Sequence, residues 1–303
     1  MNKKRWLGCI FGLVVFGCVA WADDLPVLAG PYLGQPPPGG DPQRFAAGIV
    51  GPERCVFNAT FAPDGREFYY SVKEESGRET IMVMRRVDGQ WRGPENAPFV
   101  SRHNDCDPFF SADGRRLWFI STRPQEASGA AKDWDIWYVE RTTGGWTAAV
   151  NAGPPVNSPQ HEYYVSLTRD GTIYFASERP GGHGSFDIYR AGWQQDHFTA
   201  PENLGPAVNS DRLEHDPYVA PDESWIIFTS VDRSGGSGAG DLYLSQRRPD
   251  GTWTAARNLG PAFNTPGYEF CANVSPDGQY FFFTRSGNLF WVAMNAVLDG
   301  RTE

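Results

Sequence analysis

Short runs of aromatic and β-branched residues alternate with Gly, Pro, Asp and Ser along nearly the whole chain of 303 residues. Five of these runs belong to the same unit, in which an apolar run ends in an Asp turn and an aromatic-rich run follows. Asp-Gly between two such runs is typical of a β-hairpin, because Gly adopts a positive φ without a steric penalty. The turns are centred on Asp64, Asp113, Asp170, Asp222 and Asp277, and only Asp222 lacks the following Gly.

Each predicted hairpin is followed by a loop rich in Gly or Ser and then by a third strand, as in DWDIWYVER, FDIYRAG and GDLYLSQRR. A fourth strand is predicted to open on an aromatic residue, at Trp91, Trp146, Phe198 and Trp253. Four short antiparallel strands in a repeat of about 50 residues are the pattern of a β-propeller blade. The sequence therefore predicts an all-β protein, a β-propeller of four-stranded antiparallel blades.

The number of units predicts five blades, and a sixth blade would need a further copy of the unit. The fifth unit has no fourth strand of its own, because the chain ends soon after GNLFWVAMN. The segment PQRFAAGIVGPER, which begins at residue 42, precedes the first unit in the place where the other units have their outer strand. We expect this N-terminal segment to supply the missing outer strand, because a closed ring leaves no open sheet edge.

The first 22 residues have the pattern of a secretory signal, with basic residues 3–5, an apolar run and Ala20-Trp21-Ala22 as a cleavage site. The apolar run is shorter than the about 20 residues that a transmembrane helix needs. Lipid attachment at Cys18 is an alternative, because Val15-Phe16-Gly17-Cys18 resembles a lipobox. We therefore expect a periplasmic or secreted protein without a transmembrane span, made of a signal peptide (1–22), a Pro/Gly-rich segment (23–40) and one propeller domain (41–303).

The net charge limits the classes of partner, and the cysteine count limits the number of disulfides. The formal net charge is −9, and removal of residues 1–22, which hold three basic residues and no acidic one, makes it −12. Nucleic acid is excluded as a partner, because such a field repels polyphosphates and no run of Lys or Arg follows residue 5. Three cysteines remain, so at most one internal disulfide forms, and the sequence does not choose among Cys55, Cys106 and Cys271. We expect a monomer.

Candidate site residues emerge when each unit is indexed back from its turn Asp. Eight residues earlier, four of the five units have an acid: Asp105, Glu162, Glu214 and Glu269, with Val56 in the first unit. Six residues earlier stand Asn58, Asp107, Tyr164, Asp216 and Cys271. A basic residue follows each second strand: Lys73, Arg123, Arg179, Arg233 and Arg285.

The first strand of a propeller blade lines the central channel, so these residues are expected at the channel mouth. Positions eight and six residues before the turn have the same parity, and the alternation of a strand is expected to send their side chains the same way. The set is then either a series of ion pairs that fix the register between blades or a polar funnel for a ligand. His161 and His215 appear only in the third and fourth units, which breaks the symmetry in favour of a ligand site.

Catalysis at this mouth is the alternative to binding, and its candidate groups are Glu162, Glu214, Asp216, His161 and His215. Two carboxylates at a suitable separation hydrolyse glycosidic bonds, and a Tyr or His base serves a lyase that acts on a uronate. No metal or other cofactor is predicted. Asp105 with Asp107, or Glu214 with Asp216, offers oxygen ligands to Ca²⁺ as an alternative, although no D-x-D-x-D-G loop occurs.

The repeat resembles the PD40 class of WD40-like repeats, of which the TolB propeller is one. The matching residues are Ser275-Pro276-Asp277-Gly278, the run SERPGG from Ser177, and Asp187-Ile188-Tyr189, and the resemblance covers about residues 41–295. It implies a periplasmic or surface binding scaffold. We therefore expect a propeller that binds a glycan or an envelope protein at the channel mouth without catalysis, with a glycoside hydrolase or uronate lyase as the alternative.

Overall fold

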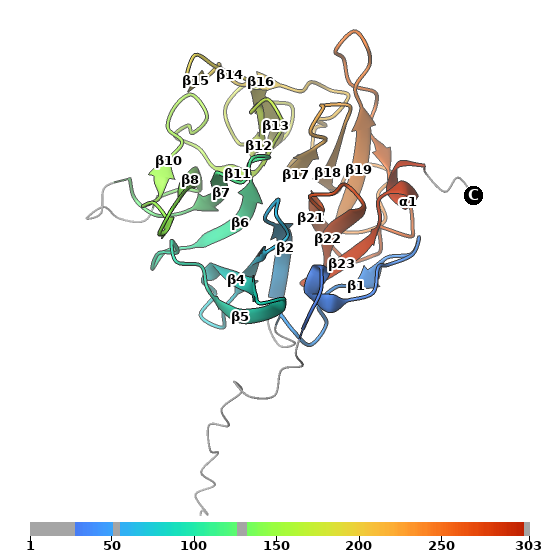
Figure 1. Ribbon diagram of the computed structural model, residues 1–303. Helices are drawn as coiled ribbons and strands as arrows, with labels where there is room; N and C mark the ends of the chain where they lie inside the picture. Colours follow the sequence, from blue (N-terminus) through green and yellow to red (C-terminus); the bar gives the residue numbers. More distant parts are fainter. Residues whose placement is uncertain (1–27, 51–54, 126–131, 300–303) are drawn as a thin grey trace, which may run out of the picture.

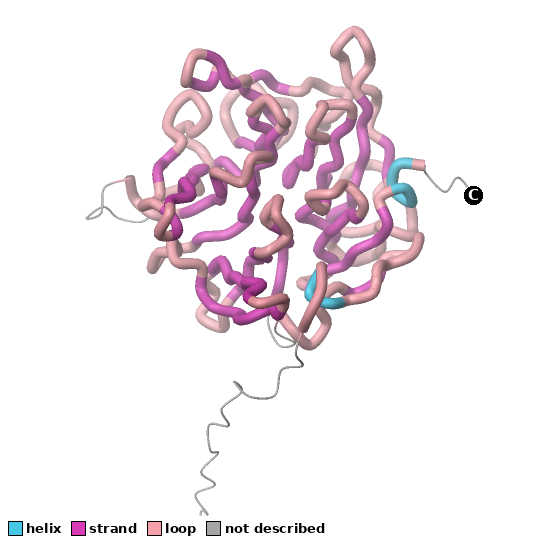
Figure 2. Tube along the Cα trace, in the orientation of Figure 1, coloured by secondary structure: helices cyan, strands magenta, loops and turns pink. Residues whose placement is uncertain are grey.

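The computed structural model describes residues 28–50, 55–125 and 132–299, and these residues form a ring of five antiparallel sheets around a central axis (Figure 1). Strands dominate, and the two helical segments are short (Figure 2). No helix in the described ranges is both long and apolar enough to span a membrane. The expected signal peptide, its lipobox cysteine Cys18 and residues 23–27 lie outside the described residues.

The five blades confirm the predicted five-bladed β-propeller, and in each blade the strands follow one another from the axis outward. Blade 1 contains β2 (Cys55–Phe61), β3 (Glu67–Lys73), β4 (Glu79–Val87) and β5 (Gln90–Asn96). Blade 2 contains β6 (Asp105–Phe110), β7 (Arg116–Ser121), β8 (Asp135–Thr142) and β10 (Val150–Asn151), with β9 (Gly145–Trp146) also paired to β8. Blade 3 contains β11 (Glu162–Leu167), β12 (Ile173–Ser177), β13 (Asp187–Ala191) and β16 (Glu202–Asn203), and β14 (Trp193–Gln194) pairs with β15 (His197–Phe198).

Blade 4 contains β17 (Leu213–Val219), β18 (Trp225–Val231), β19 (Gly240–Gln246) and β20 (Arg257–Asn258). Blade 5 contains β21 (Glu269–Val274), β22 (Tyr280–Arg285), β23 (Asn288–Ala293) and β1 (Gln43–Arg44). The helical segments are the 3-10 turn η1 (Tyr32–Gly34) and α1 (Asn295–Leu298). We call the strand next to the axis the inner strand, and the face on which the five inner strands begin the channel-mouth face.

The ring closes as the sequence predicts, because the N-terminal strand β1 completes the last blade. Gln43 lies opposite Trp291 and Arg44 opposite Phe290 in an antiparallel pair. The segment before β1 is fastened on both sides of this closure. The Tyr32 hydroxyl donates to Asp277 at 2.8 Å in blade 5, and indole Nε1 of Trp91 in blade 1 donates to the Gly30 carbonyl, also at 2.8 Å.

The hairpin turns behave as the Asp-Gly pattern predicts, with one informative exception. In every blade the turn Asp accepts the backbone N–H of the residue two positions later, as at Asp64 and Arg66 (3.0 Å). Glu223 replaces the Gly in blade 4 and still takes a positive φ of 59°, which is rare for a residue with a Cβ. Its carboxylate accepts the Tyr174 hydroxyl at 2.7 Å and pairs with Arg247, so the strained residue is held by side-chain contacts.

The predicted start of the outer strand is wrong in blades 2, 3 and 4. There the aromatic residue first forms a small hairpin or bridge next to the third strand, and the outer strand begins four residues later. An Asn in each outer strand explains the register, because its amide donates to an Asp at the first or second position of the third strand. The pairs are Asn151 with Asp135 (2.9 Å), Asn203 with Asp187 (2.7 Å) and Asn258 with Asp241 (3.1 Å).

Candidate functional site

Every inner strand contains a β-bulge six residues before its turn Asp. The bulged residues have left-handed φ values between 48° and 55°, and the strand register shifts at the same place: Asn58, Asp107, Tyr164, Asp216 and Cys271. A bulge inserts one residue into one strand, so it interrupts the alternation of side chains. The expectation that positions eight and six residues before the turn point the same way is therefore wrong, and the two sets have different surroundings.

The four acids eight residues before the turn are fully buried at the start of the inner strands of blades 2 to 5. Asp105 shows the pattern: it accepts the Ser121 hydroxyl at 2.6 Å, the Arg123 guanidinium at 2.6 Å and the Ser101 N–H at 2.5 Å. In the other three blades the nearest nitrogen–oxygen distances are 3.3 Å for Arg179 and Glu162, 3.8 Å for Arg233 and Glu214, and 3.0 Å for Arg285 and Glu269.

Each of these arginines also donates to backbone carbonyls of the linker that arrives from the preceding blade. Arg123 reaches Phe99 at 3.2 Å, and Arg179 reaches Val156 at 2.5 Å. Arg233 and Arg285 make the same kind of contact with Val208 and Phe263. We call each set of buried acid, arginine and linker carbonyls an arginine clamp. The clamp joins its two charges within one blade and fastens that blade to the incoming linker.

The clamps contain the acids and arginines that the sequence predicts at the channel mouth. The structure brings each acid to its own arginine, blade by blade, and each pair is confined to that blade. Burial raises the pKa of Glu162 above its ordinary value. Hydrogen bonds from Ser158 and Ser177 and the charge of Arg179 act in the opposite direction but do not cancel the effect of burial. Blade 1 has no clamp, because Val56 replaces the acid and the Lys73 side chain is 52% exposed and lies 3.8 Å from Glu79.

The bulged residues Asp107 and Asp216 meet near the propeller axis with two buried cysteines. Asp216 accepts the Cys271 N–H at 3.0 Å, and the Cys271 thiol donates to Asp107 at 3.6 Å. Burial raises the pKa of Asp107 well above its ordinary value, and the negative charge of Asp216 adds to the effect. Burial likewise raises the pKa of the Cys106 and Cys271 thiols, and neither these two nor Cys55 is in a disulfide.

Asp107→Asn is expected to raise the melting temperature at neutral pH and to change it little in acid. Because the folded pKa of Asp107 exceeds its ordinary value of 3.8, the carboxyl favours folding below that value and loses this contribution as the pH rises through the folded pKa. Asn is a neutral isostere that tolerates the positive φ at this position. Thermal unfolding of both proteins across the acid-to-neutral range measures the difference.

Asp113→Asn provides the control of opposite sign. Burial acts to raise the pKa of Asp113, but hydrogen bonds from Ser111 and from the Arg115 N–H outweigh it and lower the pKa below the ordinary value. This carboxylate therefore stabilises the fold above that value, and the contribution is lost as the pH falls through the folded pKa. A lower melting temperature for Asp107→Asn than for wild type at neutral pH would contradict the assignment of Asp107.

His215 links Asp216 to the surface of the channel-mouth face. Its Nδ1 lies 2.9 Å from Asp216 Oδ1, and its Nε2 lies 2.7 Å from the Tyr268 hydroxyl. A neutral His215 that donates from Nδ1 to the carboxylate accepts the Tyr268 proton at Nε2. Burial raises the pKa of Tyr268, and the charge of Asp216 adds to this, so the hydroxyl stays protonated at neutral pH.

The site positions predicted from the sequence were only those eight and six residues before each turn Asp. A ring of side chains that stand seven residues before the turn Asp was therefore missed. That position holds Phe57, Tyr163, His215 and Phe270, with Cys106 in blade 2. Neighbouring side chains extend the ring: Tyr268 lies 5.1 Å from Phe270, and Tyr163 lies 5.6 Å from Trp134 and 5.1 Å from Phe186 between ring centroids. We call this set the aromatic ring. The sequence contained the signal, since four of five units have a cyclic planar side chain at the same position.

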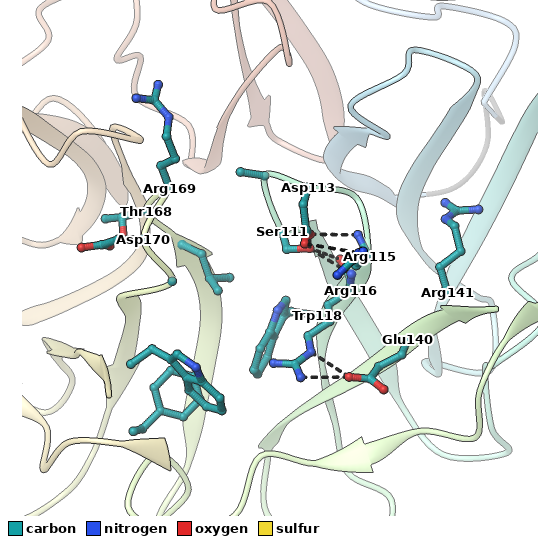
Figure 3. Close-up of a pocket in the computed structure, with 15 residues that line it drawn as sticks. Ser111, Asp113, Arg115, Arg116, Trp118, Glu140, Arg141, Thr168, Arg169 and Asp170 are labelled. Atoms are coloured by element: carbon teal, nitrogen blue, oxygen red, sulfur yellow. Dashed lines mark hydrogen bonds and ion pairs between the residues drawn. The ribbon is translucent and has the colours of Figure 1, made fainter. Parts of the chain in front are cut away.

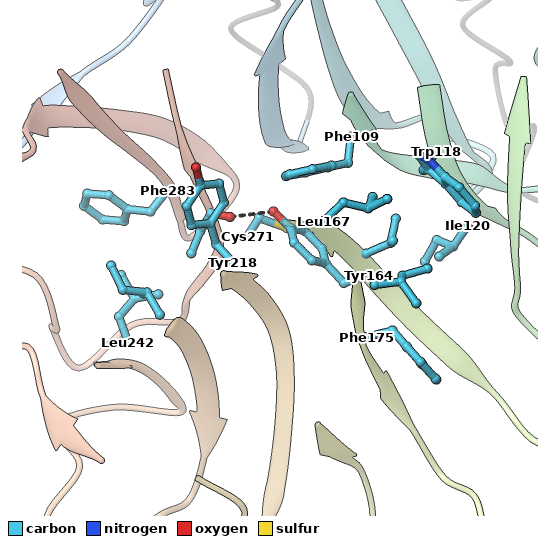
Figure 4. Packing of buried hydrophobic residues seen from close by; sticks show 14 of the residues in the cluster. Phe109, Trp118, Ile120, Tyr164, Leu167, Phe175, Tyr218, Leu242, Cys271 and Phe283 are labelled. Atoms are coloured by element: carbon cyan, nitrogen blue, oxygen red, sulfur yellow. Dashed lines mark hydrogen bonds between the residues drawn. The ribbon is translucent and has the colours of Figure 1, made fainter. Parts of the chain in front are cut away.

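The other predicted site residues, His161 and Tyr164, form hydrogen bonds within the fold. His161 accepts the Trp134 N–H at its Nδ1 (3.1 Å), and the fully buried Tyr164 donates to the Ala272 carbonyl at 2.7 Å among the axial residues that Figure 4 shows. Within residues 28–50, 55–125 and 132–299, no three His, Cys, Asp or Glu side chains are placed to hold a metal ion. The oxygens of Asp105 and Glu214 that were considered for Ca²⁺ are engaged in their clamps.

Comparison with known proteins supports the fold and goes no further. No protein-family model matches the chain, and no curated protein matches it. Among solved structures, a putative TolB from Agrobacterium tumefaciens aligns with a TM-score of 0.50 at 18% identity, over 77% of this chain and 70% of that one. An α-L-arabinofuranosidase from Podospora anserina, in complex with cellotriose, aligns with a TM-score of 0.52 at 10% identity, over 80% and 91%.

TolB from Acinetobacter baumannii aligns with a TM-score of 0.48 at 15% identity, over 78% of this chain and 53% of that one. The present chain therefore spans about half the length of that TolB structure. At such identities a likeness between structures establishes the fold alone, since one propeller fold serves many unrelated functions. The class defined by fold and comparison is the β-propeller with TolB-like neighbours.

Proposed function

We propose that the protein is an exported, PD40-type binding propeller that holds a glycan against the aromatic ring without catalysis. The aromatic ring carries the proposal. Its partly exposed members are Trp134, Tyr163, His215, Tyr268 and Phe270, while Phe57 and Phe186 are buried. Planar side chains that are partly open to solvent stack on the apolar faces of sugar rings, and their polar ends bind hydroxyl groups. The N-terminal signal pattern supports export to the periplasm or the cell exterior. An envelope protein is the other ligand class that the sequence suggests, and a glycan fits the ring better.

Binding is favoured over catalysis by the state of the acids on this face. Hydrolysis of a glycosidic bond needs two carboxyl groups that reach the substrate. Glu162 and Glu214 are fully buried in their clamps, and Asp216 is engaged by His215 and by the Cys271 N–H. The raised pKa of Tyr268 suits a hydrogen-bond donor rather than a base, because a base would need the phenolate.

Binding of neutral and acidic oligosaccharides to the immobilised protein tests the proposal. Tyr163→Ala and Tyr268→Ala are each expected to weaken binding about tenfold, because loss of one aromatic anchor at a binding site costs more than about 1 kcal/mol. Val87→Ala, which truncates an exposed apolar side chain of blade 1 outside the ring, is the control and should leave this binding unchanged. Failure of every oligosaccharide to bind, or binding by both ring variants that is as tight as binding by wild type, would sink the proposal.

A glycan-degrading enzyme is the second candidate, and the hydrogen-bonded series Asp216–His215–Tyr268 is the observation that favours it. A carboxylate that orients a histidine beside a hydroxyl is an arrangement used for proton transfer. An enzyme of this kind should release new reducing or unsaturated sugar ends, and Tyr268→Phe should abolish that release while binding is retained. Binding by the wild-type protein without any change in substrate mass would exclude this candidate.

A further inference from the structure

A cavity of about 950 Å³ lies between blades 2 and 3, at the ends of the inner strands away from the channel mouth (Figure 3). Its walls come from the hairpin turns of the two blades, residues 111–115 and 168–171, and from the small β14–β15 hairpin. The inner strands β6 and β11 begin at Asp105 and Glu162 on the channel-mouth face, and their opposite ends border this cavity. None of the cavity residues belongs to the clamps or to the aromatic ring.

The charge of the cavity differs in sign from that of the chain. Four arginines and three acids line it, which leaves one formal positive charge in a protein whose net charge is −9. Arg116 pairs with Glu140 at 2.9 Å and lies 5.6 Å from the Trp193 ring centroid. Arg169 is exposed and, among the residues drawn in Figure 3, joins no ion pair. Hydrogen bonds from Ser224 lower the pKa of Asp222 in the turn of blade 4, and the charge of Arg169 adds to this, so Arg169 lies near one carboxylate outside the cavity lining. Within the lining its guanidinium pairs with no acid and can bind an anion.

The acids of the cavity remain ionised acceptors at neutral pH. The Thr168 hydroxyl lowers the pKa of Asp170, and the Thr172 N–H adds to this. Hydrogen bonds also leave the pKa of Asp113 below its ordinary value. Two ionised carboxylates beside guanidinium groups suit a ligand that has hydroxyl donors as well as one negative charge.

An aromatic wall completes the cavity. Trp193 is 37% exposed and packs edge-on against Phe198, with 4.7 Å between ring centroids. The buried Trp118 also lines the cavity, and its indole N–H has no hydrogen-bond partner among the described residues. That N–H is buried, so the exposed side chain of Trp193 is the part of the wall that a ligand can contact.

We propose that this cavity is a second binding site, separate from the aromatic ring, for a sugar residue that carries one carboxylate. The guanidinium of Arg169 binds the carboxylate, the ionised acids accept the sugar hydroxyls, and the Trp193 ring covers the apolar face of the sugar. A polyphosphate fits poorly, because the cavity offers a single net positive charge within an acidic protein. The site does not depend on the proposed function of the aromatic ring.

Calorimetric titration with cellobiouronate and with cellobiose tests the site, because the two disaccharides differ by one carboxylate in place of a hydroxymethyl group. Wild type is expected to bind cellobiouronate at least about tenfold more tightly than cellobiose, and higher salt should reduce the difference. Equal binding of the two sugars, or no binding of cellobiouronate, would overturn the proposal.

Variants locate the site. Arg169→Ala and Trp193→Ala should each weaken cellobiouronate binding about tenfold, because each removes one direct contact to the ligand. Arg66→Ala removes an exposed arginine from the turn of blade 1, outside the cavity, and should change binding by less than about twofold. Tyr268→Ala, which tests the aromatic ring, should leave this binding intact. Loss of binding in Arg66→Ala or Tyr268→Ala, with retention in Arg169→Ala, would assign the sugar to another surface and refute the cavity site.

Discussion

Arg123→Ala is expected to lower the free energy of unfolding by about 3–5 kcal/mol, because it leaves a buried carboxylate without its counter-charge. Asp105 is 0% exposed and the Arg123 side chain 12% exposed, so water does not replace the guanidinium. The substitution also removes the bond to the Phe99 carbonyl and the packing of the guanidinium over the Phe119 ring at 4.9 Å. Urea denaturation followed by tryptophan fluorescence measures the loss.

Lys73→Ala is the matched control, because Lys73 occupies the position of Arg123 in the blade that has no clamp. Its side chain is 52% exposed and its partner Glu79 lies at 3.8 Å, so the loss should stay below about 1 kcal/mol. The double variant Arg123→Ala with Asp105→Asn should recover part of the stability, since the uncompensated charge is gone. If Arg123→Ala costs no more than Lys73→Ala, the clamp is not a stabilising device.

The features that the sequence predicted are those that local rules determine. Asp-Gly turns between β-rich runs set the hairpins, and five copies set the five blades. The closure by β1 was predictable because the fifth unit lacks an outer strand and an unpaired segment precedes the first. The pairing of Gln43 with Trp291 confirms that reasoning. The repeat also predicted, as one of two alternatives, that the acids and the arginines after the second strands form ion pairs, but it predicted pairs between blades, and the structure forms them within single blades.

The bulges were not predictable in the same way. Asn and Asp tolerate a left-handed φ, which accounts for Asn58, Asp107 and Asp216. Tyr and Cys do not favour it, yet Tyr164 and Cys271 adopt the same φ. The conformation that all five positions share therefore comes from packing at the axis. One inserted residue per inner strand then changes which side chains share a surface. For this reason the acids eight residues before the turn and the bulged acids separate, and the aromatic ring lies at the position between them.

The outer strands and the cavity show a second limit of sequence reasoning. In blade 3 the aromatic Phe198 precedes the outer strand, whose place is set by the bond from Asn203 to Asp187. Such a bond joins residues 16 apart, and no local pattern marks it. The cavity likewise combines turns of two blades, so Arg116 and Trp193 meet only in the folded ring.

Phe45→Ala is expected to cost about 3–5 kcal/mol of the free energy of unfolding, because it opens a cavity at the junction that closes the ring. Phe45 follows β1 and is 2% exposed. Its ring lies 5.6 Å from that of Phe68 in blade 1 and 5.1 Å from those of Phe282 and Trp291 in blade 5. One side chain therefore joins the first blade to the last, and its loss weakens both contacts together.

Two controls separate closure from ordinary core packing. Arg44→Ala removes the neighbouring exposed side chain of β1, which bonds only to Asn288 in the described contacts, and should cost less than about 1 kcal/mol. Phe281→Ala creates a cavity elsewhere in blade 5, at a fully buried side chain. Limited proteolysis under native conditions should then cut the segment before β1 faster in Phe45→Ala than in Phe281→Ala at equal global stability. The reason is that Phe45, unlike Phe281, packs against both the first and the last blade beside that segment. Equal cleavage rates would show that β1 is held by its backbone pairing with β23 and that Phe45 contributes only to the core.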